Sequence, residues 1–234
     1  MVMADKKEGK INSVGIILDG NRRWAKANGL PSLEGHRRGY NKLRELSDWT
    51  EEKGIEYVTV YAFSTENWNR SKEEVMYLMD LFRILLKKDL PEFHKKGKRL
   101  RFIGDLKRLA PDLQEGIKKA EELTKNNTRG TLCACISYGG RGEIVNATRE
   151  MIKKGMKPED VTEESFIKNL YAPDIPDPEL IIRTGGEMRL SNFLTWQSIY
   201  SEFFFPKKFW PEFEKEDFFA ILEEFATRKR NHGK

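Results

Sequence analysis

Short apolar runs alternate along the chain with longer amphipathic stretches, and the two kinds of segment predict strands and helices. The apolar runs are rich in β-branched and aromatic residues, which favour strands. The expected strands cover 13–18, 57–63, 99–105, 131–138 and 179–184. Between them, apolar residues recur every three or four positions, as on one face of a helix. The expected helices cover 35–54, a stretch from residue 71 onward, 112–126, 141–154 and 215–229.

This alternation predicts an α/β fold with a central, mainly parallel β-sheet flanked by helices. Ligands of such sheets bind beyond the carboxyl ends of the strands. Polar segments follow four of the expected strands, with the sequences DGNRRW (19–24), STENWNR (64–70), GGRGE (139–143) and GGEMRLSN (185–192). We therefore expect one site at this edge of the sheet, in a single domain spanning 1–234 whose residues 1–10 form a disordered extension.

The helix expected after residue 70 begins with a recognisable start signal. Ser71 followed three residues later by Glu74 predicts a capping box, in which each side chain bonds the other residue's backbone. An apolar stripe follows at helical spacing, made of Val75, Leu78, Met79, Phe82, Leu85 and Leu86. By itself the stripe indicates packing against a core.

The first polar segment, 19–24, has the character of a phosphate site. Gly20 and Asn21 allow a tight turn, and the free N–H groups of a helix starting there would bind a phosphate. Arg22 and Arg23 add forked guanidinium donors. Asp19 beside a phosphate requires a cation between them, and Mg²⁺ held by one carboxylate and phosphate oxygens fits that need. A carboxylate that caps the helix and pairs with an arginine is an equally good interpretation of Asp19.

The other polar segments offer further groups for phosphate. Arg70 could reach a second phosphate, and Arg183, Arg189 and Ser191 surround a glycine turn suited to a diphosphate. The alternative for the glycine turn is a loop that carries surface arginines. His36, which follows a glycine, is of a type more often structural than catalytic.

Composition narrows the function classes. Lys and Arg number 42 against 37 Asp and Glu, an excess too small to indicate nucleic acid binding. The apolar runs are too short to span a membrane, and the first residues lack a signal-peptide pattern. Cys133 and Cys135 alternate in one expected strand and predict buried free thiols, hence a cytoplasmic protein. There is no pattern for a zinc site, a P-loop or a Ser/His/Asp triad.

Together the polar motifs resemble those of the cis-prenyltransferases, the undecaprenyl diphosphate synthase family. The likeness runs from about residue 11 to the C-terminus. It rests on GIILDGNRRWAK (15–26), GHRRGY (35–40), YAFSTENWNRSKEEV (61–75), IGD (103–105), SYGGRGEI (137–144), IIRTGGEMRLSNFLTWQSIYSEFFF (181–205) and WPEF (210–213).

The resemblance implies an enzyme that joins an allylic prenyl diphosphate to isopentenyl diphosphate with Mg²⁺ and gives a cis-polyprenyl diphosphate. It also implies a homodimer, a hydrophobic product tunnel beside the helix after residue 71, and peripheral membrane contact for product release. The implied metal residues are Asp19 and Glu202. The implied catalytic residues are Asp19, Asn21 and Asn67. The implied substrate-binding residues are Gly20, Arg22, Arg23, Trp24, His36, Ser64, Glu66, Trp68, Arg70, Arg183, Arg189 and Ser191.

Three positions depart from the family's pattern. Ser32 and Asn231 stand where family members often carry an arginine at a phosphate site, and Gly130 stands where a bulky residue often forms the tunnel floor. These changes leave two alternatives open. One is a prenyltransferase with relaxed acceptor choice, using dimethylallyl diphosphate or a non-prenyl alcohol. The other is a subunit of a heteromeric enzyme, although such partners usually lack the aspartate found here at position 19.

Overall fold

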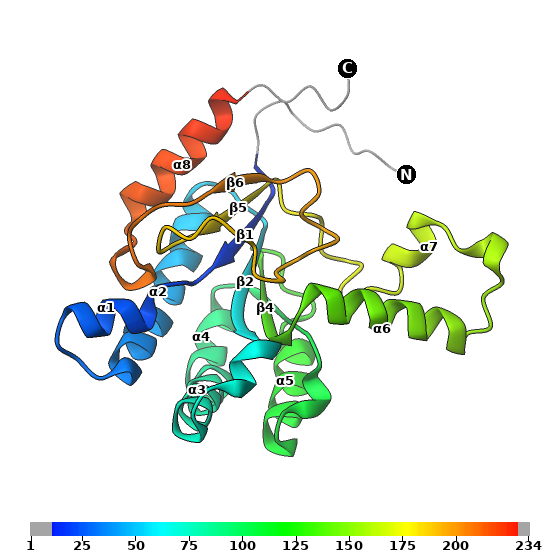
Figure 1. The fold of residues 1–234 in the computed structure, drawn as a ribbon, viewed down its shortest axis with the longest axis horizontal. Coiled ribbons are helices and arrows are strands. Elements are labelled where there is room, and N and C mark those ends of the chain that lie inside the picture. Colours follow the sequence, from blue (N-terminus) through cyan, green and yellow to red (C-terminus); the bar gives the residue numbers. More distant parts are fainter. Residues whose placement is uncertain (1–10, 229–234) are drawn as a thin grey trace.

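The computed structural model describes residues 11–228 and builds them around one parallel sheet (Figure 1). Its strands lie in the order β3-β4-β2-β1-β5-β6, and every pairing between neighbours is parallel. The predicted fold class is therefore confirmed. The strands are β1 (Ser13–Ile17), β2 (Tyr57–Ser64), β3 (Arg99–Ile103), β4 (Thr131–Tyr138), β5 (Leu180–Arg183) and β6 (Glu202–Phe204).

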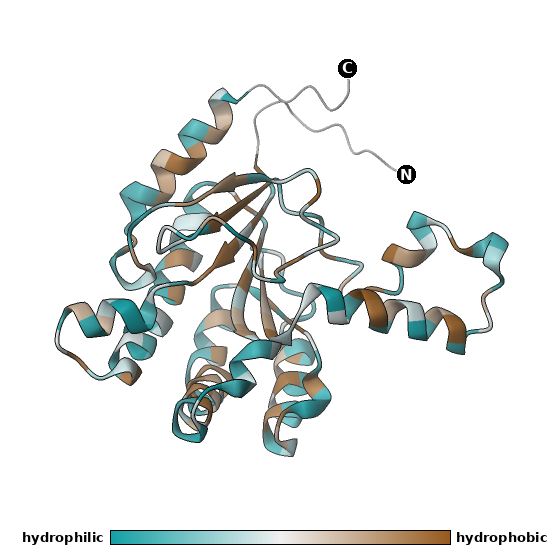
Figure 2. Ribbon diagram, in the orientation of Figure 1, coloured by the Kyte–Doolittle hydropathy of each residue, from teal (hydrophilic) through white to brown (hydrophobic). Residues whose placement is uncertain are grey.

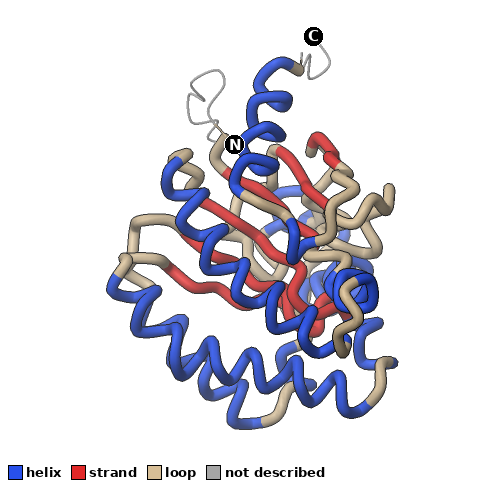
Figure 3. Tube along the Cα trace, turned by 90° about the vertical axis from the view of Figure 1, so that its left-hand side faces the viewer, coloured by secondary structure: helices blue, strands red, loops and turns tan. Residues whose placement is uncertain are grey.

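Helices run alongside the strands, as the view turned by 90° shows (Figure 3). The helices are α1 (Asn21–Ala27), α2 (Ser32–Glu52), α3 (Lys72–Ile84), α4 (Leu90–Lys95), α5 (Pro111–Thr124), α6 (Gly140–Lys153), α7 (Glu163–Ile167) and α8 (Lys215–Thr227). A π-helical turn, η2 (Leu85–Asp89), joins α3 to α4. Short 3₁₀ turns lie at η1 (Thr65–Asn69), η3 (Leu106–Arg108), η4 (Pro158–Asp160) and η5 (Trp210–Glu212).

The two faces of the sheet bury two separate apolar clusters. Successive strand residues point to opposite faces, so Ile16 belongs to one cluster and Ile17 to the other. The larger cluster receives side chains from α2, α3, α4, α5 and α8. The smaller one is covered by the loop after β5, through Phe193 and Leu194. The strands are accordingly the most hydrophobic part of the centre (Figure 2).

The order of the strands fixes where a ligand can bind. The chain passes from β1 to β2 on one side, whereas β5 pairs with β1 on the other side. In open parallel sheets a crevice forms between two neighbouring strands whose connections run to opposite sides of the sheet order. It lies beyond the carboxyl ends of those two strands. Here that point lies after Ile17 and Arg183, which pair in register.

The sequence predicted most elements and missed the short ones. The five expected strands and the helices between them are present within a few residues of their expected ends. The sequence did not predict α4, α7 or the three-residue strand β6. Cys133 and Cys135 are free and buried, as predicted, and burial raises the pKa of the Cys133 thiol to about 12. The predicted disorder of 1–10 and the departure at Asn231 lie outside the described residues.

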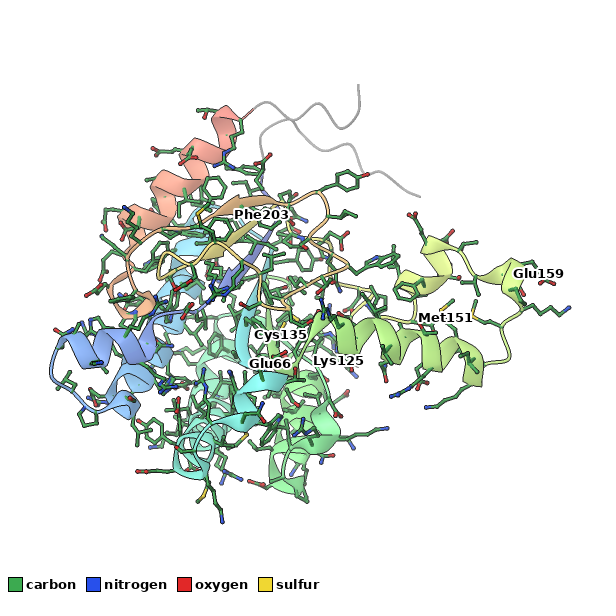
Figure 4. All side chains as sticks on the ribbon, viewed as in Figure 1. Glu66, Lys125, Cys135, Met151, Glu159 and Phe203 are labelled. Carbon is green, nitrogen blue, oxygen red and sulfur yellow. The ribbon has the colours of Figure 1, made fainter. Side chains whose placement is uncertain are left out.

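Helices α6 and α7 extend away from the sheet as an arm (Figure 1). Met151 and Glu159 lie on this arm, whereas Glu66 and Cys135 lie near the centre of the molecule (Figure 4). Within residues 11–228, no helix combines the length and apolar character needed to cross a membrane.

Candidate active site

A cavity of about 580 Å³ opens at the carboxyl ends of β1, β2 and β5. One part of its wall is polar and comes mostly from the ends of these strands and the segments that follow them, with His36 from α2. The other part is apolar and comes mostly from α2 and α3, with Ala62 from β2. The polar wall includes Asp19, Asn21, His36, Ser64, Glu66, Asn67, Arg70, Arg183, Ser191 and Asn192. The apolar wall includes Leu43, Ala62, Leu78, Leu81 and Phe82.

Asp19 and Arg183 form the central ion pair of the polar wall. Nε and one terminal nitrogen of Arg183 donate to Oδ2 of Asp19 at 3.2 and 2.8 Å. The remaining terminal nitrogen of Arg183 donates to the hydroxyl of Ser191 at 2.7 Å. The Arg183 side chain is 6% exposed and that of Asp19 is 27% exposed. The carboxylate is therefore open to a ligand, whereas the guanidinium supports it from behind.

Asp19 is held as an ionised carboxylate. Burial alone would raise its pKa, but the hydrogen bonds and charge of Arg183, followed by the charge of Arg23, hold that pKa below its usual value. A terminal nitrogen of Arg23 lies 3.3 Å from Oδ2 of Asp19. The backbone of the turn is fixed as well, because Thr184 Oγ1 and the Trp210 amide donate to the Asp19 carbonyl at 2.7 and 2.9 Å.

The turn after β1 requires a glycine at position 20. Gly20 has φ of 103°, a conformation that side-chain-bearing residues rarely adopt, and a Cβ there would lie 2.6 Å from the ring of Phe209. This turn leads directly into α1 at Asn21. The same ring of Phe209 lies under the guanidinium of Arg23, 5.2 Å from it, and so helps to place Arg23 beside Asp19.

His36, Glu74 and Arg70 form a second polar group on the cavity wall. Nε2 of His36 lies 2.9 Å from Oε1 of Glu74, and Arg70 donates to the same oxygen at 2.9 Å. Glu74 is ionised because the hydrogen bond from His36 and the charge of Arg70 outweigh the burial that would raise its pKa. An ionised carboxylate only accepts, so Nε2 of His36 carries the proton. Burial lowers the pKa of His36, and the opposing hydrogen bond to Glu74 does not reverse this effect. His36 is thus neutral at neutral pH.

The segment after β2 is folded by its own side chains. Ser64 and Asn67 form a capping box around η1, in which Asn67 Oδ1 accepts from the Ser64 amide at 3.1 Å. Glu66 accepts a hydrogen bond from Asn192, at 3.1 Å, and so links this segment to the turn after β5. Trp68 donates to the Ser137 hydroxyl at 3.0 Å. The polar segments predicted to meet at one edge therefore do meet.

Comparison with known proteins decides the family. A family model described as putative undecaprenyl diphosphate synthase matches residues 17–233. An isoprenyl transferase of Thermotoga maritima is 48% identical, over 94% of this chain and 95% of that protein. A trans,polycis-polyprenyl diphosphate synthase ((2Z,6E)-farnesyl diphosphate specific) of Thermobifida fusca is 45% identical, over 94% of this chain and 79% of that protein. The chain belongs to the undecaprenyl diphosphate synthase family. It is a prenyltransferase, and the predicted cis-prenyl chain elongation is confirmed.

A solved structure of a relative shows the same fold. Lavandulyl diphosphate synthase from Lavandula x intermedia, crystallised in complex with dimethylallyl diphosphate, has a TM-score of 0.93 and 36% identity to this chain. The alignment covers 97% of this chain and 100% of that one. The family fold is therefore shared with a synthase that was crystallised with dimethylallyl diphosphate.

The cavity of this prenyltransferase brings together most of the predicted site residues but not all. Its lining contains Asp19, Asn21, His36, Ser64, Glu66, Asn67, Arg70, Arg183 and Ser191. The other predicted residues lie behind or beside it. Arg23 contacts Asp19, and Trp68 donates to Ser137. Arg22 is exposed and lies 3.8 Å from Glu74. Trp24 lies under Arg38, at 5.9 Å, and exposed Arg189 pairs with Glu187 at 2.5 Å.

Glu202, predicted to share a metal with Asp19, lies elsewhere in the chain. It begins the edge strand β6, in register with Leu180, whereas Asp19 follows the residue in register with Arg183. Three residues along a strand and two strand spacings separate Glu202 from Ile17 by roughly 14 Å, and Asp19 lies two residues beyond Ile17. Glu202 instead accepts a hydrogen bond from Arg228 at 2.8 Å. The described residues contain no cluster of three or more His, Cys, Asp or Glu able to hold a metal ion.

The polar wall nevertheless fits a Mg²⁺ ion bound together with a diphosphate. Such an ion needs one or two protein carboxylates, with phosphate oxygens and water as its other ligands. Asp19 offers an ionised carboxylate that is open to the cavity, and the side-chain contacts of Arg183 and Arg23 all reach Oδ2. In addition, Oδ1 of Asn21 is buried without a partner among the described residues. This oxygen lies against Gly39 of α2, where a Cβ would approach it to 2.2 Å, so Asp19 remains the group that would hold the ion.

The sequence did not identify Glu74 as a partner of His36 and Arg70, and it placed Gly130 at the floor of the product tunnel. Half of the predicted capping box at Ser71 is present, because the Ser71 hydroxyl accepts from the Glu74 amide at 3.3 Å. The other half is wrong, because the Glu74 carboxylate bonds to His36 and Arg70 instead of the Ser71 amide. The proximity of Glu74 to Arg70 at helical spacing was the available signal. Gly130 lies at the start of β4 beside a separate small hollow, outside the lining of the main cavity.

Proposed function

We propose that this prenyltransferase condenses an allylic prenyl diphosphate with isopentenyl diphosphate, using Mg²⁺, to give a cis-polyprenyl diphosphate. The observation that carries the proposal is the division of one cavity into a polar and an apolar wall. A diphosphate headgroup matches the arginines and amides of the polar wall. A growing hydrocarbon chain matches the leucines and phenylalanine contributed by α2 and α3.

The chemistry needs positive charge at the departing diphosphate. The allylic C–O bond breaks and its electron pair leaves with the diphosphate. The alkene of isopentenyl diphosphate attacks the allylic carbon, and the resulting cation loses a proton to restore a double bond. Arg23 and Arg70 would bind the leaving diphosphate, while Arg183, Arg189 and Ser191 would bind that of the acceptor. No protein nucleophile is required.

Mg²⁺ would be held by Asp19 together with diphosphate oxygens. Bound there, it would neutralise charge that develops on the leaving group. Asn21 and Asn67 would orient the substrate through their side-chain amides, while neutral His36 would act as a hydrogen-bonding group fixed by Glu74. Glu202 would contribute to a metal site only if a second copy of the chain presented it, because within one chain it lies away from Asp19.

A second acceptor is a specific alternative. The lavender synthase, which binds dimethylallyl diphosphate, matches this chain over nearly its whole length. Ser32, at the exposed start of α2, is one of the two departures that remove an arginine from a phosphate site. Ser32 belongs to the allylic diphosphate site, whereas the other departure, Asn231, stands where the family's arginine reaches the acceptor diphosphate. The loss of that arginine would weaken the binding of isopentenyl diphosphate and lower its advantage over dimethylallyl diphosphate or a non-prenyl alcohol. The homodimer, the heteromer, the cytoplasmic location, the peripheral membrane contact and the extent of the single domain remain predictions.

The test is a product assay on the purified full chain. Labelled isopentenyl diphosphate is incubated with allylic diphosphates of several lengths, with Mg²⁺ or with a chelator, and extracted products are separated by chromatography. We expect labelled products spaced by one isoprene unit with Mg²⁺ and none with the chelator. Labelled dimethylallyl diphosphate as sole substrate tests the alternative. Absence of product with every allylic primer would refute the proposal.

A further inference from the structure

Three polar contacts connect helix α2 to the segment formed by η2 and α4. On α2 the contributing residues are spaced four apart, so they lie on one face of the helix. Tyr40 donates to Asp89, Arg44 pairs with Glu92, and Asp48 pairs with Lys96 at 2.7 Å. We call these three pairs the α2–α4 ladder.

The first pair of the ladder differs from the others in burial. Asp89 is only 7% exposed, whereas Arg44, Glu92, Asp48 and Lys96 each expose at least 36% of their side chains. Exposed ion pairs contribute little to stability, so the outer pairs are not expected to fix the helices strongly. A buried carboxylate that accepts a tyrosine hydroxyl is costly to disrupt, because its other partner, a terminal nitrogen of Arg44, lies 3.9 Å from it, beyond hydrogen-bond distance.

The first pair also differs in what it touches. Tyr40 lines the cavity on the apolar side, together with Leu43 of α2 and Leu78, Leu81 and Phe82 of α3. Its hydroxyl donates to Asp89, the last residue of the π-helical turn η2, which is not part of the cavity lining. A π turn inserts one extra residue, which rotates the following residues by about 100° relative to an uninterrupted α-helix. The turn therefore sets the direction in which Asp89 faces.

We infer that Tyr40, held in place by Asp89, is a wall of the hydrocarbon chamber that limits the length of the product. This inference rests on the proposed function. A phenol ring tethered at its far end cannot swing aside as an untethered side chain could, so the growing chain meets a fixed obstacle. Asp89 is not part of the cavity lining, so the carboxylate that holds the ring does not face the apolar chamber. Asp89 is a positioning residue, and Tyr40 is the group that contacts the chain.

The test is the distribution of product lengths from purified full-length variants, measured with one allylic primer. Tyr40→Ala removes the ring, and its products should be longer than those of the wild type by about one isoprene unit or more. Asp89→Ala keeps the ring but frees it, and a smaller shift toward longer products is expected. Lys96→Ala breaks the exposed third pair as a matched control and should leave the distribution unchanged. If Tyr40→Ala does not fold, as judged by its circular dichroism, Tyr40→Leu takes its place.

The outcomes separate this inference from the proposed function. Unchanged product length in an active Tyr40→Ala or Tyr40→Leu variant would overturn the inference alone. Equal lengthening in Lys96→Ala would also overturn it, because the ladder as a whole, and not the tethered ring, would then control length. A wild-type chain that makes no prenyl product would refute the proposed function, and this inference with it.

Discussion

The polar and apolar walls of the cavity are built in different ways. The polar wall is fixed by hydrogen-bonded pairs, Asp19 with Arg183 at the ends of β1 and β5 and His36 of α2 with Glu74 of α3. The apolar wall comes from regular helix, where side chains such as Leu78 are placed by packing. Under the proposed function, this difference predicts that bond-making and product length depend on separate residues. Substitutions in the two walls should therefore have separable effects.

The largest expected effect belongs to the polar wall. Asp19→Asn keeps a hydrogen-bond acceptor for Arg183 but removes the negative charge that Mg²⁺ requires. Turnover should fall by about 10²–10³-fold while product length stays the same. Steady-state kinetics with labelled isopentenyl diphosphate measures this change. Turnover within a few-fold of wild type would break the comparison between the walls.

Asp19→Ala should behave differently from Asp19→Asn in stability. The Arg183 guanidinium is buried, and alanine would leave it without its main acceptor. The free energy of unfolding should fall by about 1–3 kcal/mol, as measured by denaturant titration. The ion pair with Arg183 is therefore expected to make this variant lose stability as well as turnover. Equal stability of the alanine variant and the wild type would contradict the supporting role of Asp19.

The next effect tests where Glu202 acts. Since Glu202 lies away from Asp19 in its own chain, we expect it to serve the site of a second copy. Glu202→Gln should lower turnover by about tenfold or more, with little loss of stability because its pair with Arg228 is partly exposed. Mixing this variant with Asp19→Asn should restore activity, since a mixed dimer contains one site with both carboxylates. No recovery after mixing under exchange conditions would mean that Glu202 does not act across a dimer.

A substitution in the apolar wall should change length and not rate. Leu78→Phe places extra volume in the cavity, so the products should become shorter, while turnover of the first condensation stays within a few-fold of wild type. Leu113→Phe is the matched control, because Leu113 is buried on α5 outside the cavity lining. It should destabilise the protein by about 1–3 kcal/mol through overpacking and leave product length unchanged. Chromatography of the products and thermal melting measure the two properties. Shortening by both variants would contradict separate control.

The smallest expected effect concerns the pH dependence of stability. Burial lowers the pKa of His36 below its ordinary value of about 6.5, so below that pH the unfolded chain takes up a proton that the folded chain does not. Stability should therefore fall as the pH drops from 7 toward 5.5, by at most about 1.4 kcal/mol per pH unit. His36→Asn should lack this part of the decline. Denaturant titrations at several pH values measure the stability of both proteins. The same decline in stability with falling pH in His36→Asn and in the wild type would argue against a buried neutral His36.

The sequence predicted the sheet well because its central strands are long apolar runs bounded by turn residues. It missed β6 because three residues, Glu202–Phe204, give too short an alternation to distinguish a strand from a loop. Helix α4 was hidden within the stripe that begins in α3, since the π turn shifts the helical period at Leu85–Asp89.

For the site, the sequence placed the polar motifs at the right edge of the sheet but did not identify the partners of their side chains. Asp19 was left between a metal ligand and the partner of an arginine, and the structure shows that the arginine partner exists, in Arg183. Glu74 was assigned to a cap because the local pattern explains it fully, whereas its contact with His36 joins residues 38 positions apart. Contacts of this kind depend on how α2 and α3 pack, which no local pattern contains.

The most direct test of separate control by the two walls measures initial turnover and product length in the same reactions, for wild type, Asp19→Asn and Leu78→Phe. The account predicts that Asp19→Asn loses turnover but keeps the wild-type length in its residual product, and that Leu78→Phe shortens the product but keeps turnover within a few-fold of wild type. A shift in length with Asp19→Asn, or a loss of turnover with Leu78→Phe as large as that of Asp19→Asn in a folded protein, would contradict it.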